Sequence, residues 1–577
     1  SRKAIIDNAI ELPDGENFEL HKPWMDRILI NCPKCNNICH RELFVLDTWH
    51  NSGAAPYASL SDREYDEFIP ATFLTEGIDQ TRGWAYTLLI ENVIMQNSSI
   101  SPYKGFLFQG HILDEKGNKM SKRLGNIVEG YKTLNENSVD LLRFYLMRKA
   151  DPAKSLNFSF EEMNARPYQV ISTLFNLHKY LKQNGDYDNF DKEKHTLDWA
   201  INQKLLSSPD YWILSKLQNL VCNITDMFID SNFDVVTKLI DDFTIESFSQ
   251  IYLPMVRNEI WNDDESQLNR RLSIYSIIYH ILYNLNILLH PISPFITEYL
   301  FHSMFGNKPI LEQKWPQSND NLLNNNLEGE FKSLQIIISQ SNSARMKGKL
   351  KRRWPLKSAL VYSDDQSSSN LITHKELLQT FCNVREVLFL EDIEQLPIKL
   401  SISPNYEILG KKLKADINEF RIIIKKQNAL NLFKHFINHE SFDLKINNNN
   451  YNILKSEIKF QFDANDDYVL SAKAGFIVIL PKNRDSDLFI EGYLRDLARR
   501  IQSERKALGL NPSEILNNTL IYGIDSDTKK LLISKLSELK YLIRTKNVEI
   551  VDNVSSEHNW SEINIDGNSL KIAIEHS

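Results

Sequence analysis

The sequence of 577 residues is poor in cysteine, glycine and proline: it has five cysteines, 19 glycines and 19 prolines. Five unevenly placed cysteines cannot build a disulfide scaffold, so we expect a reducing, cytoplasmic setting. So little glycine and proline argues against a loop-dominated or collagen-like chain. The sequence also lacks a long uninterrupted apolar run, because serine, histidine and asparagine interrupt the most apolar stretch, 272–289. We interpret that stretch as a buried helix and expect no membrane span.

Positive charge is not in excess either. The sequence has 67 Lys and Arg and 75 Asp and Glu, so its formal net charge at pH 7 is 67 − 75 = −8. A nucleic-acid-binding face can still lie on such a chain where its cations are grouped. The first residues have no methionine, no basic segment and no apolar segment, so we expect no signal peptide. The missing methionine suggests a chain that starts within a longer gene product.

The residues that are present divide the chain into stretches with different patterns, and about 150 residues per domain predicts three or four domains. Residues 1–150 hold short apolar runs separated by Gly and Pro, typical of strand–loop–helix units. Within them GFLFQGHIL (105–113) predicts a buried strand that enters a loop. Residues 151–335 have helical periodicity, and 210–229 carries apolar residues at i, i+3, i+4 and i+7.

The later part of the chain mixes both patterns. The helix predicted around 272–289 should stop at His290-Pro291, because proline removes a backbone donor and disfavours helix before it. GFIVIL (475–480) predicts a strand, and the pattern of 491–508 predicts a helix. The asparagine-rich segments are predicted to be loops; they are 319–326 and 446–450.

One short basic segment, Lys119-Met120-Ser121-Lys122-Arg123, suggests phosphate chemistry. Two lysines three positions apart on a loop can place two ammonium groups on one polyphosphate. Displacement of pyrophosphate from ATP builds negative charge on the α-phosphoryl and leaving oxygens, which positioned lysines stabilise most in the transition state. For an isolated K-x-x-K, a solvated basic turn is the alternative interpretation.

A second segment, Glu76-Gly77-Ile78-Asp79-Gln80-Thr81-Arg82-Gly83-Trp84, groups two carboxylates, a carboxamide and an arginine around glycines. Glycine lets a ligand approach the backbone closely. The alternative is a helix N-terminus with a capping acid.

A third segment, Cys32-Pro33-Lys34-Cys35 followed by Cys39-His40, has the thiol spacing of half a zinc site. The sequence has no second C-x-x-C, so Cys32 and Cys35 could hold zinc only with Cys39 or His40 in a tight loop. The alternative is a turn without metal.

Together these segments resemble a known family. The basic pentapeptide is similar to the KMSKS signature of class I aminoacyl-tRNA synthetases, with Arg123 in place of the last serine. Three segments follow one another along the chain: Asp47-Thr48-Trp49-His50-Asn51-Ser52-Gly53, then 76–84, then the basic pentapeptide. This order resembles that of the isoleucyl-tRNA synthetases, particularly the archaeal and eukaryotic-cytosolic branch. The segments Tyr211–Leu217, His290–Phe295 and Trp315-Pro316 resemble the helical anticodon-binding domain of these enzymes.

The resemblance implies a role for particular residues. The adenylate would be lined by Glu76, Gly77, Asp79 and Gln80. The ATP-binding residues would be His111, Met120, Ser121 and Lys122. The isoleucine side chain would lie between Trp49 and Trp84, flat rings that shape an apolar pocket. A lone histidine such as His111 could equally have only a positioning role.

Grouped cations in the last third of the chain suggest contact with RNA. Six of the nine residues 345–353 are Arg or Lys, and Trp354 beside them could stack on a base or pack inward. A stripe of basic residues along 491–508 is a second candidate: Arg495, Arg499, Arg500, Arg505 and Lys506. For either group a solvated basic face is the alternative. From these two groups we predict the following residues as tRNA-binding: Lys347, Lys349, Lys351, Arg352, Arg353, Arg499 and Arg500.

Two features of the family are missing from this sequence. We find no H-x-G-H, the first signature of class I synthetases, and of the editing insertion only the exit is recognisable, at His21–Asp26. The implied fold is a Rossmann-like α/β catalytic half with a parallel sheet, then an all-α bundle, then a mixed α+β domain. The implied ranges are the editing exit at 1–30, the catalytic half at 31–155, the anticodon-binding domain at 156–335 and a tRNA-contacting domain at 336–577.

The resemblance thus implies isoleucine–tRNA ligation, in which ATP, L-isoleucine and tRNA(Ile) give isoleucyl-tRNA, AMP and diphosphate through an isoleucyl-adenylate. Lys119 and Lys122 would be catalytic, ATP and Mg²⁺ the cofactors with zinc as a further candidate, and the protein a cytoplasmic monomer that binds no membrane. One alternative is a tRNA-binding fragment without independent catalysis, because the first signature is missing. Another is a valine-specific relative, which 79–84 disfavours.

Overall fold

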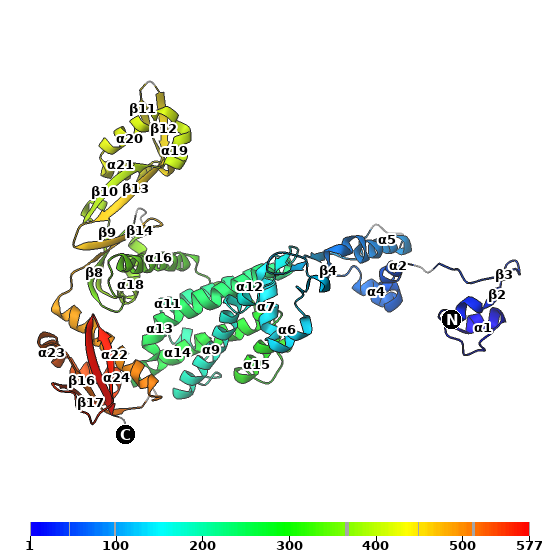
Figure 1. Ribbon diagram of the computed structural model, residues 1–577, viewed down its shortest axis with the longest axis horizontal. Coiled ribbons are helices and arrows are strands. Elements are labelled where there is room, and N and C mark those ends of the chain that lie inside the picture. Colours follow the sequence, from blue (N-terminus) through cyan, green and yellow to red (C-terminus); the bar gives the residue numbers. More distant parts are fainter. Residues whose placement is uncertain are drawn as a thin grey trace. The chain divides into compact units, whose positions relative to one another are not determined.

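A computed structural model describes residues 2–44, 47–96, 100–363, 368–447, 449–510 and 514–575. The chain divides into two compact units, Ser1–Asn321 and Leu322–Ser577, which we describe separately (Figure 1).

The first unit opens with small α/β elements. A three-stranded antiparallel sheet is ordered β1-β2-β3, and it is accompanied by one short helix and one helical turn. These elements are α1 (Arg2–Asn8), β1 (Ala9–Glu11), η1 (Trp24–Arg27), β2 (Leu29–Asn31) and β3 (Ile38–Cys39).

Next comes a β–α–β unit whose two strands are parallel. Its elements are α2 (Thr48–Gly53), α3 (Ala55–Ser59), α4 (Asp62–Phe68), β4 (Leu74–Gly77), η2 (Ile78–Arg82), α5 (Trp84–Gln96) and β5 (Phe106–Gln109). Strand β4 pairs with β5 in register, and α5 forms the connection between them. Parallel pairing needs such a helical crossover, so the strand–loop–helix prediction for this part is confirmed.

The strand predicted over 105–113 is split into two. Strand β5 ends at Gln109, and β6 (Ile112–Leu113) pairs instead with β7 (Leu156–Asn157). At the break, a Cβ on Gly110 would lie 2.2 Å from the carbonyl carbon of Lys154, so only glycine fits this close approach. The prediction of a buried strand is wrong in one respect: β5 is only half-buried, because in the described residues it has a single neighbouring strand.

A bundle of helices follows. Between β6 and β7 lie η3 (Lys122–Leu124), α6 (Gly130–Glu136) and α7 (Val139–Lys149). After β7 come α8 (Phe160–Met163), α9 (Arg166–Tyr187), α10 (Leu197–Asn202), α11 (Ser208–Ile229), α12 (Phe233–Asp241), η4 (Asp242–Tyr252), α13 (Leu253–Ile260), η5 (Glu265–Gln267), α14 (Leu268–Leu289), α15 (Pro294–Met304), η6 (Ile310–Glu312) and η7 (Asp320–Leu322). The segment η4 is π-helical, whereas the two helices that it joins are α-helical.

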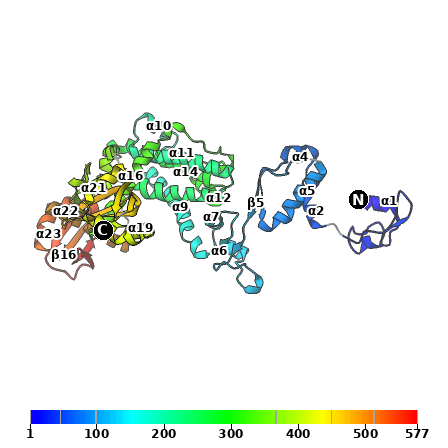
Figure 2. The same ribbon diagram turned by 90° about the horizontal axis from the view of Figure 1, so that it is seen from above.

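The bundle core confirms the helical periodicity of the sequence. The apolar stripe of α11, from Ile213 to Ile224, is buried, and α11 packs along α14 (Figure 1, Figure 2). Helix α14 begins at Leu268 and ends at Leu289, directly before His290-Pro291 as predicted. By length and composition the stretch Glu265–Leu289 could cross a membrane, but 78% of its most apolar window is buried inside the structure. That burial is typical of the core helix of a packed bundle.

The second unit is a mixed α/β structure with several sheets. Its first part comprises α16 (Asn325–Lys347), β8 (Leu356–Ser363), α17 (Ser368–Leu371), η8 (Ile372–His374), α18 (Lys375–Cys382), β9 (Val384–Leu390), η9 (Ile393–Gln395), β10 (Ile398–Pro404), α19 (Tyr406–Leu413), η10 (Lys414–Asp416), α20 (Ile417–Lys426), α21 (Ala429–Asn438), β11 (Ser441–Ile446), β12 (Asn449–Leu454), η11 (Lys455–Glu457), β13 (Ile458–Ala464), β14 (Tyr468–Lys473) and β15 (Phe476–Pro481). The rest comprises α22 (Ser486–Ala507), β16 (Leu516–Tyr522), α23 (Ser526–Ile533), α24 (Leu536–Ile543), β17 (Thr545–Val551), β18 (Trp560–Ile565) and β19 (Asn568–Glu575).

Two four-stranded sheets, ordered β14-β15-β8-β9 and β17-β16-β19-β18, and the two-stranded pairs β10-β13 and β11-β12 organise this unit. The strand predicted at 475–480 is β15, and the helix predicted over 491–508 is part of α22. The loop predictions for the asparagine-rich segments are only partly right. Asn325 already belongs to α16, and Asn449 and Asn450 pair with β11 in a hairpin. The backbone N–H and C=O groups of this asparagine-rich segment are satisfied by pairing between β11 and β12 across the short turn at Asn447. Composition alone could not indicate this pairing.

Candidate functional site

Helix α2 brings the segment 47–53 against α5. The carboxylate of Asp47 caps α2 by accepting a hydrogen bond from the Trp49 amide at 2.9 Å. His50 Nδ1 lies 3.1 Å from Glu91 Oε1 on α5. A Cβ on Gly53 would lie 2.7 Å from the same carboxylate oxygen, so glycine permits the close approach of the two helices.

The segment 76–84 begins at the carboxyl end of β4 and leads into α5. Gln80 Oε1 accepts a hydrogen bond from the Trp84 amide at 3.1 Å, and Gln80 Nε2 donates to Asp79 Oδ2 at 3.0 Å. The alternative of a capping acid therefore does not describe this turn, because the carboxamide of Gln80 accepts from the amide at the start of α5. Glu76 and Asp79 are exposed at this edge of the strand pair.

The two tryptophans of the predicted pocket lie close to this turn. Trp84 Nε1 donates to the Ser52 carbonyl at 2.9 Å, which ties α5 to α2. A Cβ on Gly83 would lie 2.9 Å from Trp49 Cη2 and 2.7 Å from Gln80 Oε1. Trp49, Gln80 and Trp84 thus surround one glycine, where the absence of a side chain leaves the indole of Trp49 room.

The KMSKR segment is a loop held at its base by two polar side chains. Asp114 Oδ1 accepts hydrogen bonds from the Lys116 and Asn118 amides at 3.0 and 2.7 Å. Asn126 Nδ2 donates to Asp114 Oδ2 at 2.9 Å, and Asn126 Oδ1 accepts from the Ser121 amide at 2.9 Å. The hydrogen bonds from the Asn126 side chain and the Asn118 amide lower the pKa of the Asp114 carboxyl, so these contacts favour its ionised form.

The middle of this loop is anchored while its cations are not. Met120 packs on a cluster that includes Leu141 and Tyr145 of α7. Lys119 and Lys122 are exposed, and in the part of the chain that the structure describes neither ammonium group has a hydrogen bond or ion pair. A fixed backbone with free ammonium groups is what binding of a polyphosphate needs. His111 is also exposed, and its carbonyl accepts from the Leu156 amide at 3.0 Å.

Helix α7, which supports the loop, is joined to the bundle by polar contacts that the sequence did not indicate. Arg148 Nε and Arg166 Nε donate to the two oxygens of Asp241 at 2.8 and 2.7 Å, and the Asp241 side chain is fully buried. Arg143 Nε donates to the Ile292 carbonyl at 2.7 Å. The carboxylate of Asp140 accepts from the Ile296 amide at 2.5 Å, at the start of α15. Both ends of α7 are therefore fixed to the bundle.

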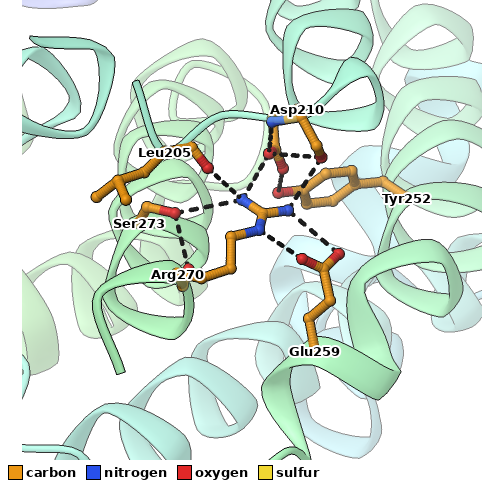
Figure 3. Close-up of polar contacts among 7 residues, drawn as sticks. Leu205, Asp210, Tyr252, Glu259, Arg270 and Ser273 are labelled. Atoms are coloured by element: carbon orange, nitrogen blue, oxygen red, sulfur yellow. Dashed lines mark hydrogen bonds and ion pairs between the residues drawn. The ribbon is translucent and has the colours of Figure 1, made fainter. Parts of the chain in front are cut away.

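A second ion cluster of the bundle is built around the buried carboxylate of Asp210, and Figure 3 shows it. Arg270 Nη1 donates to Asp210 Oδ2 at 2.6 Å, and its Nε donates to Glu259 Oε2 at 2.5 Å. Tyr252 donates from its hydroxyl to Asp210 Oδ1 at 2.8 Å, and Ser207 donates to Asp210 Oδ2 from both its amide and its hydroxyl. The one sequence signal for it was the pair Arg270-Arg271 just before the apolar run of α14.

Some cations of the second unit have structural partners. Arg345 is buried and donates to four backbone carbonyls, those of Lys351, Trp354, Cys382 and Asn383. Its inclusion among the phosphate-binding cations is therefore wrong. Burial lowers the pKa of this guanidinium to about 10, still above neutral pH.

Trp354 packs inward and is therefore not available to stack on a base. It is only 1% exposed, and its Nε1 donates to Asp496 Oδ2 at 2.8 Å. Lys351 pairs with Asp496 and Asp566 at 3.6 and 3.0 Å.

On α22, Arg505 is buried and donates to the Ile543 and Glu514 carbonyls, so it does not belong to an RNA-facing stripe. The remaining candidates are exposed: Lys347, Lys349, Arg352, Arg353, Arg499 and Arg500.

No complete metal site is formed by the described residues. Cys32 follows β2 and Cys39 lies in the paired strand β3, and the Lys34 and Cys35 amides lower the pKa of the Cys32 thiol by hydrogen bonding. In the described ranges, however, no three His, Cys, Asp or Glu side chains are placed to hold one ion. Cys32 and Cys35 therefore supply at most part of a zinc site.

Two family models match the chain. One, described as tRNA synthetases class I (I, L, M and V), matches residues 6–159, and the other, described as the anticodon-binding domain of tRNA ligase, matches residues 210–360. These matches identify class I tRNA synthetase domains in the chain: a catalytic part that has parallel strand pairs and a helical anticodon-binding part, followed by a mixed α/β C-terminal region.

Several isoleucine–tRNA ligases are among the curated relatives of the chain. The one from Saccharolobus solfataricus is 30% identical over 510 residues, which is 85% of this chain and 50% of the relative. The one from Picrophilus torridus is 28% identical over 90% of this chain and 49% of the relative. The one from Clostridium kluyveri is 26% identical over 100% of this chain and 54% of the relative. The chain spans about half the length of these relatives.

Among solved structures, a ternary complex described as LeuRS-tRNA-LeuAMS, from Agrobacterium radiobacter K84, aligns with a TM-score of 0.41 and 20% identity. The alignment covers 52% of this chain and 36% of that chain.

Proposed function

We propose that this chain is the part of an isoleucine–tRNA ligase that holds the KMSKR loop, part of the adenylate site and the tRNA-binding domains. The reaction would join L-isoleucine to tRNA(Ile) through an isoleucyl-adenylate, with release of diphosphate and AMP. The observation that carries this proposal is the KMSKR loop: its backbone is fixed by Asp114, Asn126 and Met120, whereas Lys119 and Lys122 are free of protein partners in the described residues.

The first step of the reaction transfers the adenylyl group of ATP to the carboxylate of isoleucine. Negative charge then grows on the α-phosphoryl and pyrophosphate oxygens, and Lys119 and Lys122 would stabilise it. Mg²⁺ would enter with the phosphates of ATP and neutralise part of the same charge. His111, Met120 and Ser121 would contact the nucleotide.

The amino acid and adenylate would bind where β4 ends. Ligands of α/β folds bind beyond the carboxyl ends of parallel strands, which is where Glu76, Gly77, Asp79 and Gln80 lie. Trp49 and Trp84, which α2 and α5 bring to the same turn, would form the walls of the isoleucine pocket.

The partner of the remaining domains would be tRNA(Ile). Exposed cations of the second unit would contact its phosphates: Lys347, Lys349, Arg352, Arg353, Arg499 and Arg500. Lys351 would contribute only if its ion pairs with Asp496 and Asp566 were broken. We further propose a cytoplasmic monomer. Zinc would need ligands beyond Cys32 and Cys35, and metal analysis of the purified chain would test it, since one bound zinc per chain supports the site and none contradicts it.

The test of the catalytic role is isoleucine-dependent pyrophosphate exchange by the protein that carries the complete catalytic domain. Lys122→Ala should reduce exchange by at least about 100-fold, because loss of one transition-state donor costs about 2.7–4 kcal/mol, and should leave tRNA binding within twofold. Lys116→Ala, an exposed lysine of the neighbouring turn, is the matched control and should leave exchange unchanged. Unchanged exchange by Lys122→Ala would refute the role given to that lysine.

A second candidate function is tRNA binding without independent catalysis. It is favoured by the surface of α5, where Tyr86, Ile90, Val93 and Ile94 form an exposed apolar stripe at i, i+4, i+7 and i+8. Beside it, β4 and β5 pair only with each other among the described residues. Parallel strands are usually covered on both faces, so this part of the fold lacks contacts that a complete nucleotide-binding domain has. Adenylate formation by the chain alone would exclude this candidate. Comparison of isoleucine with valine in the exchange assay would test the valine-specific alternative.

A further inference from the structure

The two four-stranded sheets of the second unit have the same topology. In each, a long helix precedes a central strand, two short helices cross over to a parallel edge strand, and an antiparallel hairpin pairs with the other side of the central strand. The elements are α16, β8, α17, α18, β9, β14 and β15 in the first case and α22, β16, α23, α24, β17, β18 and β19 in the second. We call these the first module (325–390 and 468–481) and the second module (486–575).

The agreement extends to register and sequence. Strand β8 begins with the sequence LKSALVY, and strand β16 has the sequence LNNTLIY. In the first module Leu356 faces Val384 across the parallel pair, and in the second module Leu516 faces Thr545. The central strand is therefore paired with its parallel neighbour in the same way in both modules.

Each module also buries one arginine near the end of its long helix. Arg345 of α16 donates to the carbonyl of Trp354, nine residues later, at 2.9 Å. Arg505 of α22 donates to the carbonyl of Glu514, again nine residues later, at 2.6 Å. Both guanidinium groups also donate to the carbonyl of the residue that ends the second short helix, α18 or α24. A buried cation is costly unless its hydrogen bonds are satisfied, so this repeated arrangement, with the shared topology and register, identifies two copies of one module.

The first module uses one edge to hold the long helix of the second. Its loop before β8 places Trp354 against α22, where a Cβ on Gly492 would lie 2.6 Å from Trp354 Cδ2. Glycine at this position therefore permits the close contact. Trp354 Nε1 donates to Asp496 Oδ2 of the same helix at 2.8 Å, and Lys351 Nζ lies 3.6 Å from that oxygen.

Two further positions complete this edge. Arg385, the second residue of β9, forms an ion pair with Glu491 of α22. Asn383, directly before β9, accepts a hydrogen bond at Oδ1 from Arg495 Nη1 at 2.9 Å. The helix-holding edge of the first module therefore includes Trp354, Asn383 and Arg385, and its occupant is a helix with polar groups at matching positions.

Three residues of the second module occupy the corresponding positions: Glu514, Arg544 and Lys546. Glu514 is the ninth residue after the buried arginine. Arg544 directly precedes β17 and has a φ of 51°, close to the 52° of Asn383, and Lys546 is the second residue of β17. Arg544 and Lys546 are exposed, and neither forms an ion pair with a described residue. Lys546 Nζ donates to Asn517 Oδ1 at 2.9 Å.

Apolar side chains accompany the two cations at this edge. Ile515 is 60% exposed, whereas the corresponding residue of the first module, Pro355, is buried. Tyr541, in the last turn of α24, is 77% exposed. Exposed apolar and aromatic groups beside arginine are typical of protein-binding surfaces. The carboxylate of Glu514 would repel the phosphates of a nucleic acid, so the mixed charge favours a protein helix over RNA.

We propose that the helix-holding edge of the second module binds a helix of a partner protein, in the way in which the first module holds α22. The partner helix would carry carboxylates opposite Arg544 and Lys546 and a cation opposite Glu514. Its apolar residues would cover Ile515 and Tyr541. None of these five residues has a role in the proposed function, so the two proposals are independent.

The probe is a synthetic peptide of residues 486–507, the sequence of α22, with the substitutions Arg495→Glu and Asp496→Lys. In the geometry of the first module, these changes place carboxylates opposite the two cations of the edge and an ammonium group opposite its carboxylate. Titration of the full chain with this peptide at low salt should give saturable binding. The matched control is the unsubstituted peptide, which should bind at least about tenfold more weakly because it meets like charges at two positions.

A charge exchange between chain and peptide tests the register. Lys546→Glu in the chain should weaken binding about 5- to 20-fold, and adding Glu491→Lys to the peptide should restore it. The two residues would correspond to the ion pair between Arg385 and Glu491 in the first module. The control is Lys530→Glu, which changes a lysine of α23 whose side chain is 78% exposed and should alter affinity less than twofold.

Absence of peptide binding, or binding that Lys546→Glu leaves unchanged, would overturn the docking site. Unfractionated tRNA serves as a second probe of the full chain. Binding of tRNA that Lys546→Glu weakens, without binding of the peptide, would assign this edge to RNA and overturn the proposed partner.

Discussion

Replacing Arg270 by methionine tests the energetic role of the buried cluster in Figure 3. Methionine keeps most of the volume of the side chain and removes its charge, so Asp210 would be left as a fully buried carboxylate without a cation. Breaking a buried pair from one side costs about 3–5 kcal/mol. Asp210 would keep its hydrogen bonds from Ser207 and Tyr252, which places the expected loss near the lower limit, at about 3 kcal/mol.

The second carboxylate of the cluster adds little to this loss. The side chain of Glu259 is 40% exposed, so water would solvate it once Arg270 is gone. Coulombic attraction to Asp210 and hydrogen bonding to Glu259 raise the pKa of Arg270 above its ordinary value although burial lowers it, which agrees with net stabilisation of the charged guanidinium.

Native-state hydrogen exchange is the appropriate assay, because a chain of several domains does not unfold in one two-state transition. A loss of about 3 kcal/mol should speed exchange of the protected amides of α11 and α14 about 150-fold, since 1.36 kcal/mol corresponds to tenfold. Lys238→Met, which removes an exposed i,i+4 pair with Asp234, is the control and should change exchange less than threefold. An effect of Arg270→Met below tenfold would refute the reasoning.

Two further predictions concern the bundle and the KMSKR loop. Burial lowers the pKa of His178 from 6.5 to about 4, so the folded state excludes a proton that the unfolded chain accepts. Bundle stability should therefore fall by at most about 3 kcal/mol as pH drops from about 6.5 to about 4, and equal protection of α9 amides at pH 7 and pH 4.5 would contradict this. Asp114→Ala removes the hydrogen bonds that Asp114 accepts from Asn126 and Asn118 at the base of the KMSKR loop. Trypsin should therefore cut after Lys122 and Arg123 several times faster than in the unsubstituted chain. An unchanged cleavage rate would show that Met120 alone holds the loop.

The sequence predicted those parts of the structure that depend on neighbours along the chain. The apolar spacing of 210–229 predicted the buried stripe of α11, and the proline at 291 predicted the end of α14. The predicted residues Trp49, Gln80 and Trp84 also lie together, because the turn after β4 and the packing of α2 on α5 bring them to one place.

The parts that sequence reasoning missed depend on contacts between distant segments. Arg345 and Arg505 belong to basic runs and were interpreted with their neighbours, but each donates to carbonyls of other elements, those of Asn383 and Ile543. Asp241 binds Arg148 and Arg166, which are far away in the sequence. A charged residue at a position of helical spacing gives no sign of whether its partner is water or a buried ion, so burial of charge could not be predicted here.

The π-helical segment Asp242–Tyr252 has a consequence for the evolution of this bundle. Asp241 precedes it and Tyr252 is its last residue, and each contributes to a different buried polar cluster. The wider turn of a π-helix sets the rotation of α13 relative to α12, so the number of residues between the two clusters matters more than their identity. Point substitutions at the exposed positions of this segment should be tolerated, whereas deletion of one residue would turn the Tyr252 side chain away from Asp210. Homologues should therefore vary here in composition and keep the length.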